Sequence, residues 1–328
     1  MLVSRSFMSR KILIYILLVF FSGPLFCQET SYGPGYQTLI VNNPGFTGIN
    51  LNGILRLSYF NFYPGNNYNF HSFFLSYDSY VSQLHGGTGF YISNDYLGGI
   101  LSELRGGMSY SYLLQAGKDL YINAGLSASF FHRGYNFNDA VFPDQIDQMG
   151  GISLPSSDLA TNERTTVFDV GTGFMLIYKR LAFGFAVTHL TQPDLNITGT
   201  SPEILDRKYV AHFITEIVLN KNSDLRLMPQ AYAELQGKYF CISGGAVLTN
   251  NYLSFSSLLM INNYKSIDVQ AGFSLRKDKI ALLYNYRFNL VSDYSLMPFS
   301  LIHQIGLNFI LNNVEKRIKV RTINVPGM

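Results

Sequence analysis

The feature that most constrains the fold is a strict alternation of apolar residues with polar or small residues, which recurs along most of the chain. In residues 279–290, one face carries Ile280, Leu282, Tyr284, Tyr286, Phe288 and Leu290, and the other carries Ala281, Leu283, Asn285, Arg287 and Asn289. Residues 266–276 and 299–312 alternate in the same way. A period of two is typical of a β-strand with one apolar face. The chain is therefore predicted to be all-β.

Fourteen such segments are predicted, and most of them are 10 to 14 residues long. They cover residues 51–63, 68–80, 84–94, 105–115, 119–132, 165–179, 181–190, 208–220, 224–234, 238–248, 252–262, 266–276, 279–290 and 299–312. Strands of soluble proteins have about 5 to 6 residues, whereas a tilted strand needs about 9 to 11 residues to cross a bilayer. The lengths favour a transmembrane barrel over a soluble sandwich.

The predicted connections differ in length according to the strand that they follow. The longer gaps all follow odd-numbered strands, and they are 95–104, 133–164, 191–207 and 291–298. In an up-and-down meander, odd and even connections lie on opposite sides of the membrane, and outer-membrane barrels combine short periplasmic turns with long external loops. We therefore predict an outer-membrane, antiparallel up-and-down β-barrel of about 14 strands in residues 51–312, with both termini in the periplasm.

The composition agrees with a barrel in lipid. Charged residues make up 14% of the chain and apolar residues 47%, whereas an ordinary soluble domain has about 25% charged residues. No apolar run in the mature chain is long enough for a membrane helix, and a closed barrel is the other structure that pairs every backbone polar group in lipid. The composition argues against a disordered chain, a nucleic-acid-binding protein and an ordinary cytosolic enzyme.

Residues 1–27 are predicted to be a secretory signal peptide. Arg5, Arg10 and Lys11 precede an apolar run at 12–21, which is about ten residues long. A membrane-spanning helix needs roughly 20 residues, so a cleaved signal is the stronger interpretation. A lipoprotein signal is weaker, because bulky Phe26 precedes Cys27.

Removal of this segment changes the charge and the cysteine count. The chain has 24 basic and 21 acidic residues, and the segment contains three of the basic ones and no acid, so the mature net charge is zero. No partner is implied by overall charge. Cys241 remains as the single thiol of the mature chain, which excludes an intramolecular disulfide and a cysteine zinc site.

Small residues on the polar faces of several strands leave two interpretations open. They include Gly125, Gly171, Gly173, Ala182, Gly184 and Ala186. Small side chains leave room in the lumen for a plug or a solute. They also ease the curvature of a barrel wall.

Catalytic and metal-binding signals are weak, and no cofactor is predicted. The six histidines have no metal-ligand spacing, and the G-x-S-x-G motif of serine hydrolases is absent. An outer-membrane lipid hydrolase needs a His and a Ser on neighbouring strands. The one arrangement to check is His132 with Ser127 and Ser129.

Two charged segments lie outside the predicted strands. The loop 133–164 contains five acidic residues, which suit calcium or a protein partner, or are simply solvated. Residues 313–328 form a basic periplasmic tail with Lys316, Arg317, Lys319 and Arg321. These cations suit an acidic periplasmic partner or the inner leaflet, and they also suit a terminus that stops the last strand from sliding into lipid.

A motif precedes the first strand, in the predicted periplasmic segment 28–50. Its residues are Asn43, Pro44, Gly45, Phe46, Thr47 and Gly48, and Asn-Pro-Gly predicts a turn. The motif resembles the N-P-A-[YF]-A-G sequence that opens the PorP/SprF family of type IX secretion system outer-membrane proteins of Bacteroidota. Asn43, Pro44, Phe46 and Gly48 match, while Gly45 and Thr47 replace alanines.

The resemblance implies a non-enzymatic role in the outer membrane, embedded in outer-membrane lipid. Members assist the secretion or surface attachment of a secreted or adhesin-type protein, in some cases for gliding motility, and work with a periplasmic lipoprotein ring or a peptidoglycan-linked partner. On this hypothesis, the loops 133–164 and 191–207 meet the cargo, and residues 28–50 and 313–328 face the periplasmic machinery. The alternatives are an outer-membrane channel for small or hydrophobic solutes, FadL-like or porin-like, and a lipid hydrolase.

Overall fold

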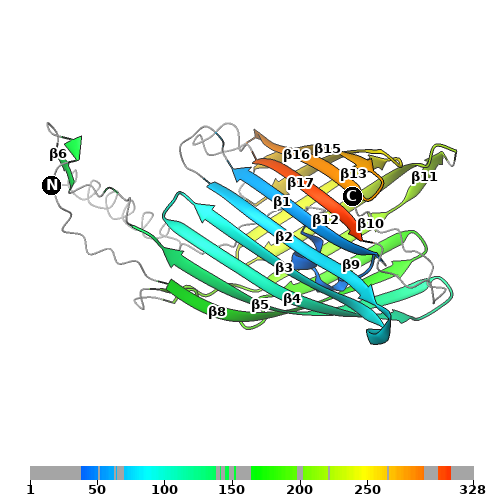
Figure 1. Ribbon diagram of the computed structural model, residues 1–328, viewed down its shortest axis with the longest axis horizontal. Coiled ribbons are helices and arrows are strands. Elements are labelled where there is room, and N and C mark those ends of the chain that lie inside the picture. The colour runs from blue at the N-terminus through cyan, green and yellow to red at the C-terminus, as the bar shows by residue number, and fades with distance from the viewer. Residues whose placement is uncertain are drawn as a thin grey trace, which may run out of the picture.

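The structure is a computed structural model of the 328-residue chain. It describes residues 38–50, 52–62, 64, 70–137, 141, 145–147, 151–152, 164–197, 202–220, 222–263, 266–291 and 302–311. Within this part, antiparallel strands form one closed barrel (Figure 1). None of the described helices is long and apolar enough to cross a membrane.

The wall consists of long strands in chain order. They are β1 (Gly53–Phe62), β2 (Phe70–Val81), β3 (Gly86–Leu97), β4 (Leu101–Gln115), β5 (Leu120–Tyr135), β8 (Arg164–Tyr178), β9 (Leu181–Thr188), β10 (Lys208–Thr215), β11 (Ile217–Asn220), β12 (Leu225–Gln236), β13 (Tyr239–Thr249), β14 (Leu253–Asn262), β15 (Ile267–Lys277), β16 (Ile280–Val291) and β17 (Ile302–Leu311). β10 and β11 both pair with β12 and form one strand interrupted at Glu216. The barrel thus has 14 strands, as predicted.

The barrel is a meander that closes between its first and last strands. Each wall strand pairs with the next wall strand along the chain, and β1 pairs with β17 from Gly53 opposite Leu311 to Phe62 opposite Ile302. The short strands β6 (Ile146–Asp147) and β7 (Gly151–Ile152) pair only with each other in a separate sheet. In the described part of the chain, closure pairs the wall strands on both sides, except for β11, which pairs with β12 alone. Paired edges are what a lipid environment requires.

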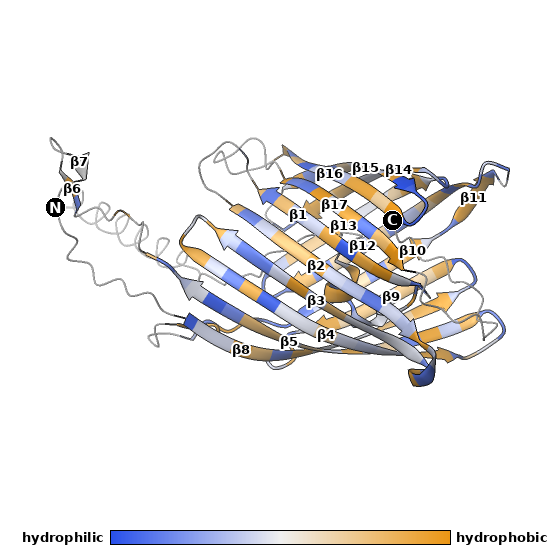
Figure 2. Cartoon of the chain, in the orientation of Figure 1, coloured by the Kyte–Doolittle hydropathy of each residue, from blue (hydrophilic) through white to orange (hydrophobic). Residues whose placement is uncertain are grey.

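The two faces of the wall have the polarity of a membrane barrel. Along β16, Ile280 and Leu282 are exposed on the outside, whereas Asn285 and Arg287 are buried on the inside. The same inversion occurs around the barrel, since Phe168 is 76% exposed while Arg105 is 2% exposed. Apolar and polar bands therefore alternate along each strand (Figure 2). An apolar outer face and a polar interior fit a barrel surrounded by lipid.

The connections confirm a short-turn end and a long-loop end, with one correction. At the short-turn end the wall strands are joined by residues 82–85, 116–119, 179–180, 221–224, 250–252 and 278–279. At the long-loop end, β5 and β8 are separated by 136–163 and β9 and β10 by 189–207. The predicted long gap at 95–104 is wrong, because pairing continues to Leu97 and resumes at Leu101. Gly98 and Gly99, at φ 69° and 77°, make this turn tight.

The segment before the first strand lies inside the barrel. It contains α2 (Leu39–Asn42) and the 3-10 turn η1 (Pro44–Phe46), followed by buried Thr47 and Gly48. Figure 1 shows this helical segment, in blue, within the ring of strands. We expected residues 28–50 outside the barrel, and the described part, 38–50, corrects that expectation. Residues 1–37 and 312–328, with the predicted signal peptide and the basic tail, lie outside the described residues.

Candidate functional site in the barrel lumen

The motif Asn43–Gly48 forms a compact turn with its own internal hydrogen bonds. Asn43 is the N-cap of η1, and its Oδ1 accepts a hydrogen bond from the Gly45 nitrogen at 2.8 Å. Pro44 occupies the first position of the turn, where its fixed φ is favourable and its missing N–H costs nothing. Gly48 has φ 66°, a conformation that favours glycine. The sequence prediction of a turn is correct.

The two sides of this turn are bonded to different strands of the wall. The Asn43 side chain donates from Nδ2 to the carbonyl oxygen of Phe174 on β8 at 3.3 Å. The Gly45 carbonyl accepts a 2.7 Å hydrogen bond from Nδ2 of Asn123 on β5. Asn43, Gly45 and Asn123 are buried, so each of them would be a buried polar group left unsatisfied if it lost its partner.

The end of the motif is bonded to the strands on the other side of β5. Thr47 is fully buried and donates from Oγ1 to Ser109 Oγ on β4 at 2.8 Å, and its carbonyl accepts from Ser111 Oγ at 2.6 Å. The Gly48 nitrogen donates to Oδ2 of Asp78 on β2 at 2.9 Å. Asp78 also forms a buried ion pair with Arg56 on β1. The motif is therefore bonded to strands from β2 to β8.

Glycines in the wall make room for the motif. A Cβ atom on Gly125 would lie 2.6 Å from the Gly45 nitrogen, and one on Gly184 would lie 2.9 Å from Asn43 Nδ2. Gly173 faces Asn43 in the same way. Of the two interpretations left open for the small residues, these three positions support room for a plug.

Phe46 anchors the turn through apolar contacts. It is 3% exposed and lies edge-on to the His212 ring of β10, with centroids 5.1 Å apart. It shares a buried cluster with Ile49, Tyr121 and Met175, among others. On the other side, Val41 of α2 packs against Phe60 and Phe74. The plug thus contacts both the β1–β2 side and the β10 side of the lumen.

The loop 189–207 folds back against the wall near the long-loop end. Leu195 and Leu205 are each 1% exposed and pack against the lumen-facing Phe131 of β5. His189 is held by Asp169, with its ring Nδ1 2.8 Å from Asp169 Oδ2, and Thr191 Oγ1 donates to Asp169 Oδ1 at 2.6 Å. The described part of this loop is therefore an ordered inner layer of the barrel mouth.

A chain of ion pairs, buried in the wall and half-buried at Glu203, ties this loop to the wall. Arg133 on β5 donates to Glu103 Oε2 on β4 at 2.8 Å and to Glu203 Oε1 of the loop at 2.5 Å. Glu103 lies 3.5 Å from Arg105, which pairs with Asp95 on β3. The alternating charges compensate one another, as buried charges must. Glu203 is the member of the chain that comes from the loop.

The wall from β13 through β17 to β2 has a different chemistry. Many of its inward side chains are hydroxyls and amides. Five of them keep a buried polar atom that has no hydrogen-bond partner in the described part of the protein: Ser72, Ser76, Ser243, Gln270 and Ser274. Such a wall suits water or a polar solute better than a packed apolar core.

The sequence also suggested a possible hydrolase arrangement around His132, and the structure separates its residues. His132 points outward and contacts Thr166 Oγ1 at 2.8 Å, whereas Ser127 and Ser129 lie on the inner face of the same strand. The proposed hydrolase arrangement is therefore wrong, because neighbouring positions of a strand face opposite sides.

Among the described residues, no cluster of three or more His, Cys, Asp or Glu side chains suits a metal ion. Lys316, Arg317, Lys319 and Arg321, and most of the acidic loop, lie outside the described residues.

Sequence reasoning missed the wall residues that hold the motif, namely Asn123, Ser109, Ser111 and Asp78. The available signal was their position on the polar face of a predicted strand, beside small residues. That signal does not show which inward side chains contact the motif, since these contacts join segments up to 132 residues apart.

Comparisons with known proteins identify a family and a fold. The family model described as type IX secretion system membrane protein PorP/SprF matches residues 28–309. No curated protein sequence matches the chain significantly. Among solved structures, the toluene transporter TodX of P. putida is similar, with 11% identity, 88% of this chain and 96% of that chain covered, and a TM-score of 0.51. A TodX deltaS2S3 mutant, a monoaromatic hydrocarbon channel, shows 12% identity, coverage of 87% and 96%, and a TM-score of 0.50. Identities this low show a shared barrel fold only.

Proposed function

Since the chain belongs to the PorP/SprF family of type IX secretion system membrane proteins, we propose that it is a non-enzymatic outer-membrane component of that system. It assists the secretion or surface attachment of a secreted, adhesin-type protein and links this cargo to periplasmic machinery. In this proposal the long-loop end faces the outside and the short-turn end faces the periplasm, as in other outer-membrane barrels.

One observation decides between a barrel through which the cargo passes and an adaptor barrel that binds other proteins at its two ends. The motif Asn43–Gly48 is buried in the lumen and bonded to strands from β2 to β8. A protein cargo that passed through this barrel would have to break those buried hydrogen bonds. The occupied lumen supports a barrel that works through its two ends, where the loops and the termini meet other proteins.

The outer end is tested by site-specific photo-crosslinking in cells. A crosslinking amino acid at exposed Asp194, in the loop 189–207, is expected to capture the secreted cargo. The same amino acid at exposed Asp278, in a turn of the short-turn end, serves as the matched control. Cargo captured at Asp278 and not at Asp194 would reverse the proposed orientation, and capture at neither position would contradict the adaptor role of this loop.

The periplasmic end is tested through the basic tail. Replacement of Lys316, Arg317, Lys319 and Arg321 by alanine is expected to reduce co-purification of the periplasmic lipoproteins of the secretion system. Replacement of Lys277 and Lys279, exposed cations of a turn at the same end, is the control and should leave co-purification unchanged. Unchanged co-purification in the tail variant would mean that the tail only limits the position of the last strand.

A second candidate function is the outer-membrane channel for small or hydrophobic solutes, and the chemistry of the lumen favours small polar solutes. The hydroxyl and amide wall with unpartnered atoms at Ser72, Ser76, Ser243, Gln270 and Ser274 favours it. The TodX proteins, which transport toluene or conduct monoaromatic hydrocarbons, share the fold. Solute flux into liposomes that contain the purified barrel, without any co-purifying secretion or surface protein, would favour the channel over the adaptor.

A further inference from the structure

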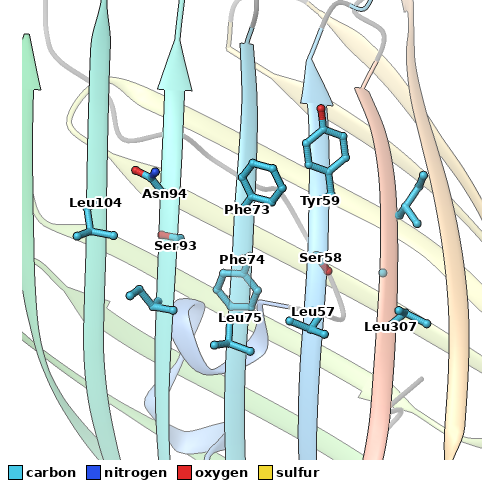
Figure 3. A pocket seen from close by; sticks show the side chains of 13 residues that line it. Leu57, Ser58, Tyr59, Phe73, Phe74, Leu75, Ser93, Asn94, Leu104 and Leu307 are labelled. Atoms are coloured by element: carbon cyan, nitrogen blue, oxygen red, sulfur yellow. The ribbon is translucent and has the colours of Figure 1, made fainter. Parts of the chain in front are cut away.

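An apolar groove lies on the outer surface of the barrel, apart from the motif in the lumen. It has a volume of about 410 Å³ and crosses β17, β1, β2 and β3 as far as Leu104 of β4. Figure 3 shows Leu57, Leu75 and Leu307 toward one end of the groove and Tyr59, Phe73 and Asn94 toward the other. The groove faces lipid, because Leu57, Phe73 and Ile305 are exposed on the apolar face of the wall.

The strand register builds this groove in successive rows. Leu307, Leu57, Leu75 and Ile92 are direct cross-strand partners and form an aliphatic row. The next row lies two positions closer to the long-loop end. It contains Ile305, Tyr59, Phe73 and Asn94. Directly paired residues on one face are the closest lateral neighbours in a sheet, so each row is a continuous surface.

A polar row follows at the next step toward the long-loop end. Tyr286, His303, Asn61, His71 and Tyr96 are direct partners across five strands, from β16 to β3. They share the outer face with the two rows below. With strands about 4.8 Å apart, the row is about 19 Å wide. A polar band of this width directly above an aliphatic groove is the profile of a lipid headgroup above its acyl chain.

The two imidazoles are positioned by their neighbours. His71 stacks on Tyr96 with centroids 4.9 Å apart and contacts Phe73 edge-on at 5.8 Å, and it has no hydrogen-bond partner among the described residues. His303 Nδ1 lies 2.7 Å from the hydroxyl of Tyr284, which leaves Nε2 of this ring for another partner. Imidazole nitrogens, phenol hydroxyls and an amide are all donors to phosphate and sugar oxygens.

We propose that this surface binds one molecule of a phosphorylated glycolipid of the outer leaflet. An acyl chain lies in the groove between Leu57, Leu75 and Leu307, and the sugar-phosphate headgroup contacts His71 and His303. The width of the polar row favours a headgroup of several sugar and phosphate groups over the single phosphodiester of a glycerophospholipid. The proposal rests on the orientation proposed above, in which the long-loop end faces the outside.

The test uses the full chain purified in detergent and native mass spectrometry, with lipid A and phosphatidylglycerol as separate probes. The unaltered protein is expected to retain lipid A. The double variant His71→Ala/His303→Ala should retain it about tenfold less, as expected when hydrogen bonds to a charged group are lost. His132→Ala is the matched control, because His132 is an outward-facing histidine near the same end whose partner is Thr166.

A second pair of variants tests the groove itself. Leu75→Trp places a large side chain in the groove and should also reduce lipid A retention, whereas Leu126→Trp adds the same side chain at an exposed outer position of β5 and should not. The electrophoretic mobility of unheated samples confirms that each variant is a folded barrel. Any of three results would overturn the proposal. These are equal retention of lipid A by all variants, retention of phosphatidylglycerol as strong as that of lipid A, and the absence of a lipid A adduct on the unaltered protein. Cargo and periplasmic partners do not enter this measurement, so its failure is distinguishable from failure of the proposed secretion role.

Discussion

The side chain of Asn123 donates a 2.7 Å hydrogen bond to the carbonyl oxygen of Gly45, and this bond joins the barrel wall to the motif in its lumen. Asn123 is 1% exposed and also donates to Ser111 Oγ at 3.1 Å, so it connects the motif to two neighbouring strands. Asn123 therefore joins the motif, β5 and Ser111 of β4 in one hydrogen-bond network.

Substitution Asn123→Ala is expected to loosen the motif. It leaves the Gly45 carbonyl buried without its close donor, which costs about 1–3 kcal/mol. The expected results are a lower urea midpoint of unfolding in detergent and larger conductance steps in planar bilayers, because the motif blocks the lumen less tightly. Asn285→Ala is the control, since Asn285 is also buried and is bonded to Gln304, its cross-strand neighbour on β17. A conductance change of equal size in both variants would contradict a specific role of Asn123.

Substitution Gly125→Ala tests whether the wall glycines accommodate the motif. The added methyl would lie 2.6 Å from the Gly45 nitrogen, and overpacking of this kind costs about 1–3 kcal/mol. We expect a smaller fraction of folded barrel in a mobility-shift assay after refolding. Gly244→Ala is the control, because a Cβ there has no atom within 4 Å. Equal yields of the two variants would mean that Gly125 serves wall curvature and not the plug.

The strands and the motif differ in how far the sequence predicts them. Every wall strand was predicted, because an inward position such as Asn285 and an outward position such as Tyr284 alternate with a period that is visible locally. The connection at 95–104 was predicted too long for a physical reason: Asp95 and Glu103 are charged, and charge in a candidate strand suggests a loop. In the closed barrel both are buried in the lumen, where they pair with Arg105 and Arg133.

The position of the motif could not be predicted from the same local signals. Asn43 and Gly48 predict a turn, and a turn is compatible with either side of the wall. Its burial depends on glycines and polar side chains from six strands that meet only when the barrel closes. The small residues of the inner faces indicated available space, but not which segment occupies it.

Substitution Arg133→Ala is expected to release the loop 189–207 from the wall. It removes the partner of half-buried Glu203 and one of the two partners of Glu103, which keeps Arg105. Hydrogen bonds to charged groups are worth about 1.5–3 kcal/mol each. Amide hydrogen exchange should become faster in the described part of the loop, around Leu195 and Leu205. Arg226→Ala is the control, because Arg226 pairs with Asp224 at the other end of the barrel. Unchanged exchange around Leu195 would show that apolar packing alone holds the loop.

Substitution Leu195→Ala tests that apolar contribution separately. Leu195 is 1% exposed and packs with Leu205 against Phe131, and truncation of such a side chain costs about 2–5 kcal/mol. Because the loop is an inner layer at the barrel mouth, the expected effect is local: faster cleavage of the loop by an added protease, with a nearly unchanged urea midpoint of the barrel. Leu126→Ala is the control, since Leu126 is 64% exposed on the outer wall. If Leu195→Ala lowered the urea midpoint of the whole barrel and left loop cleavage unchanged, the loop would be part of the barrel core and not a separable layer.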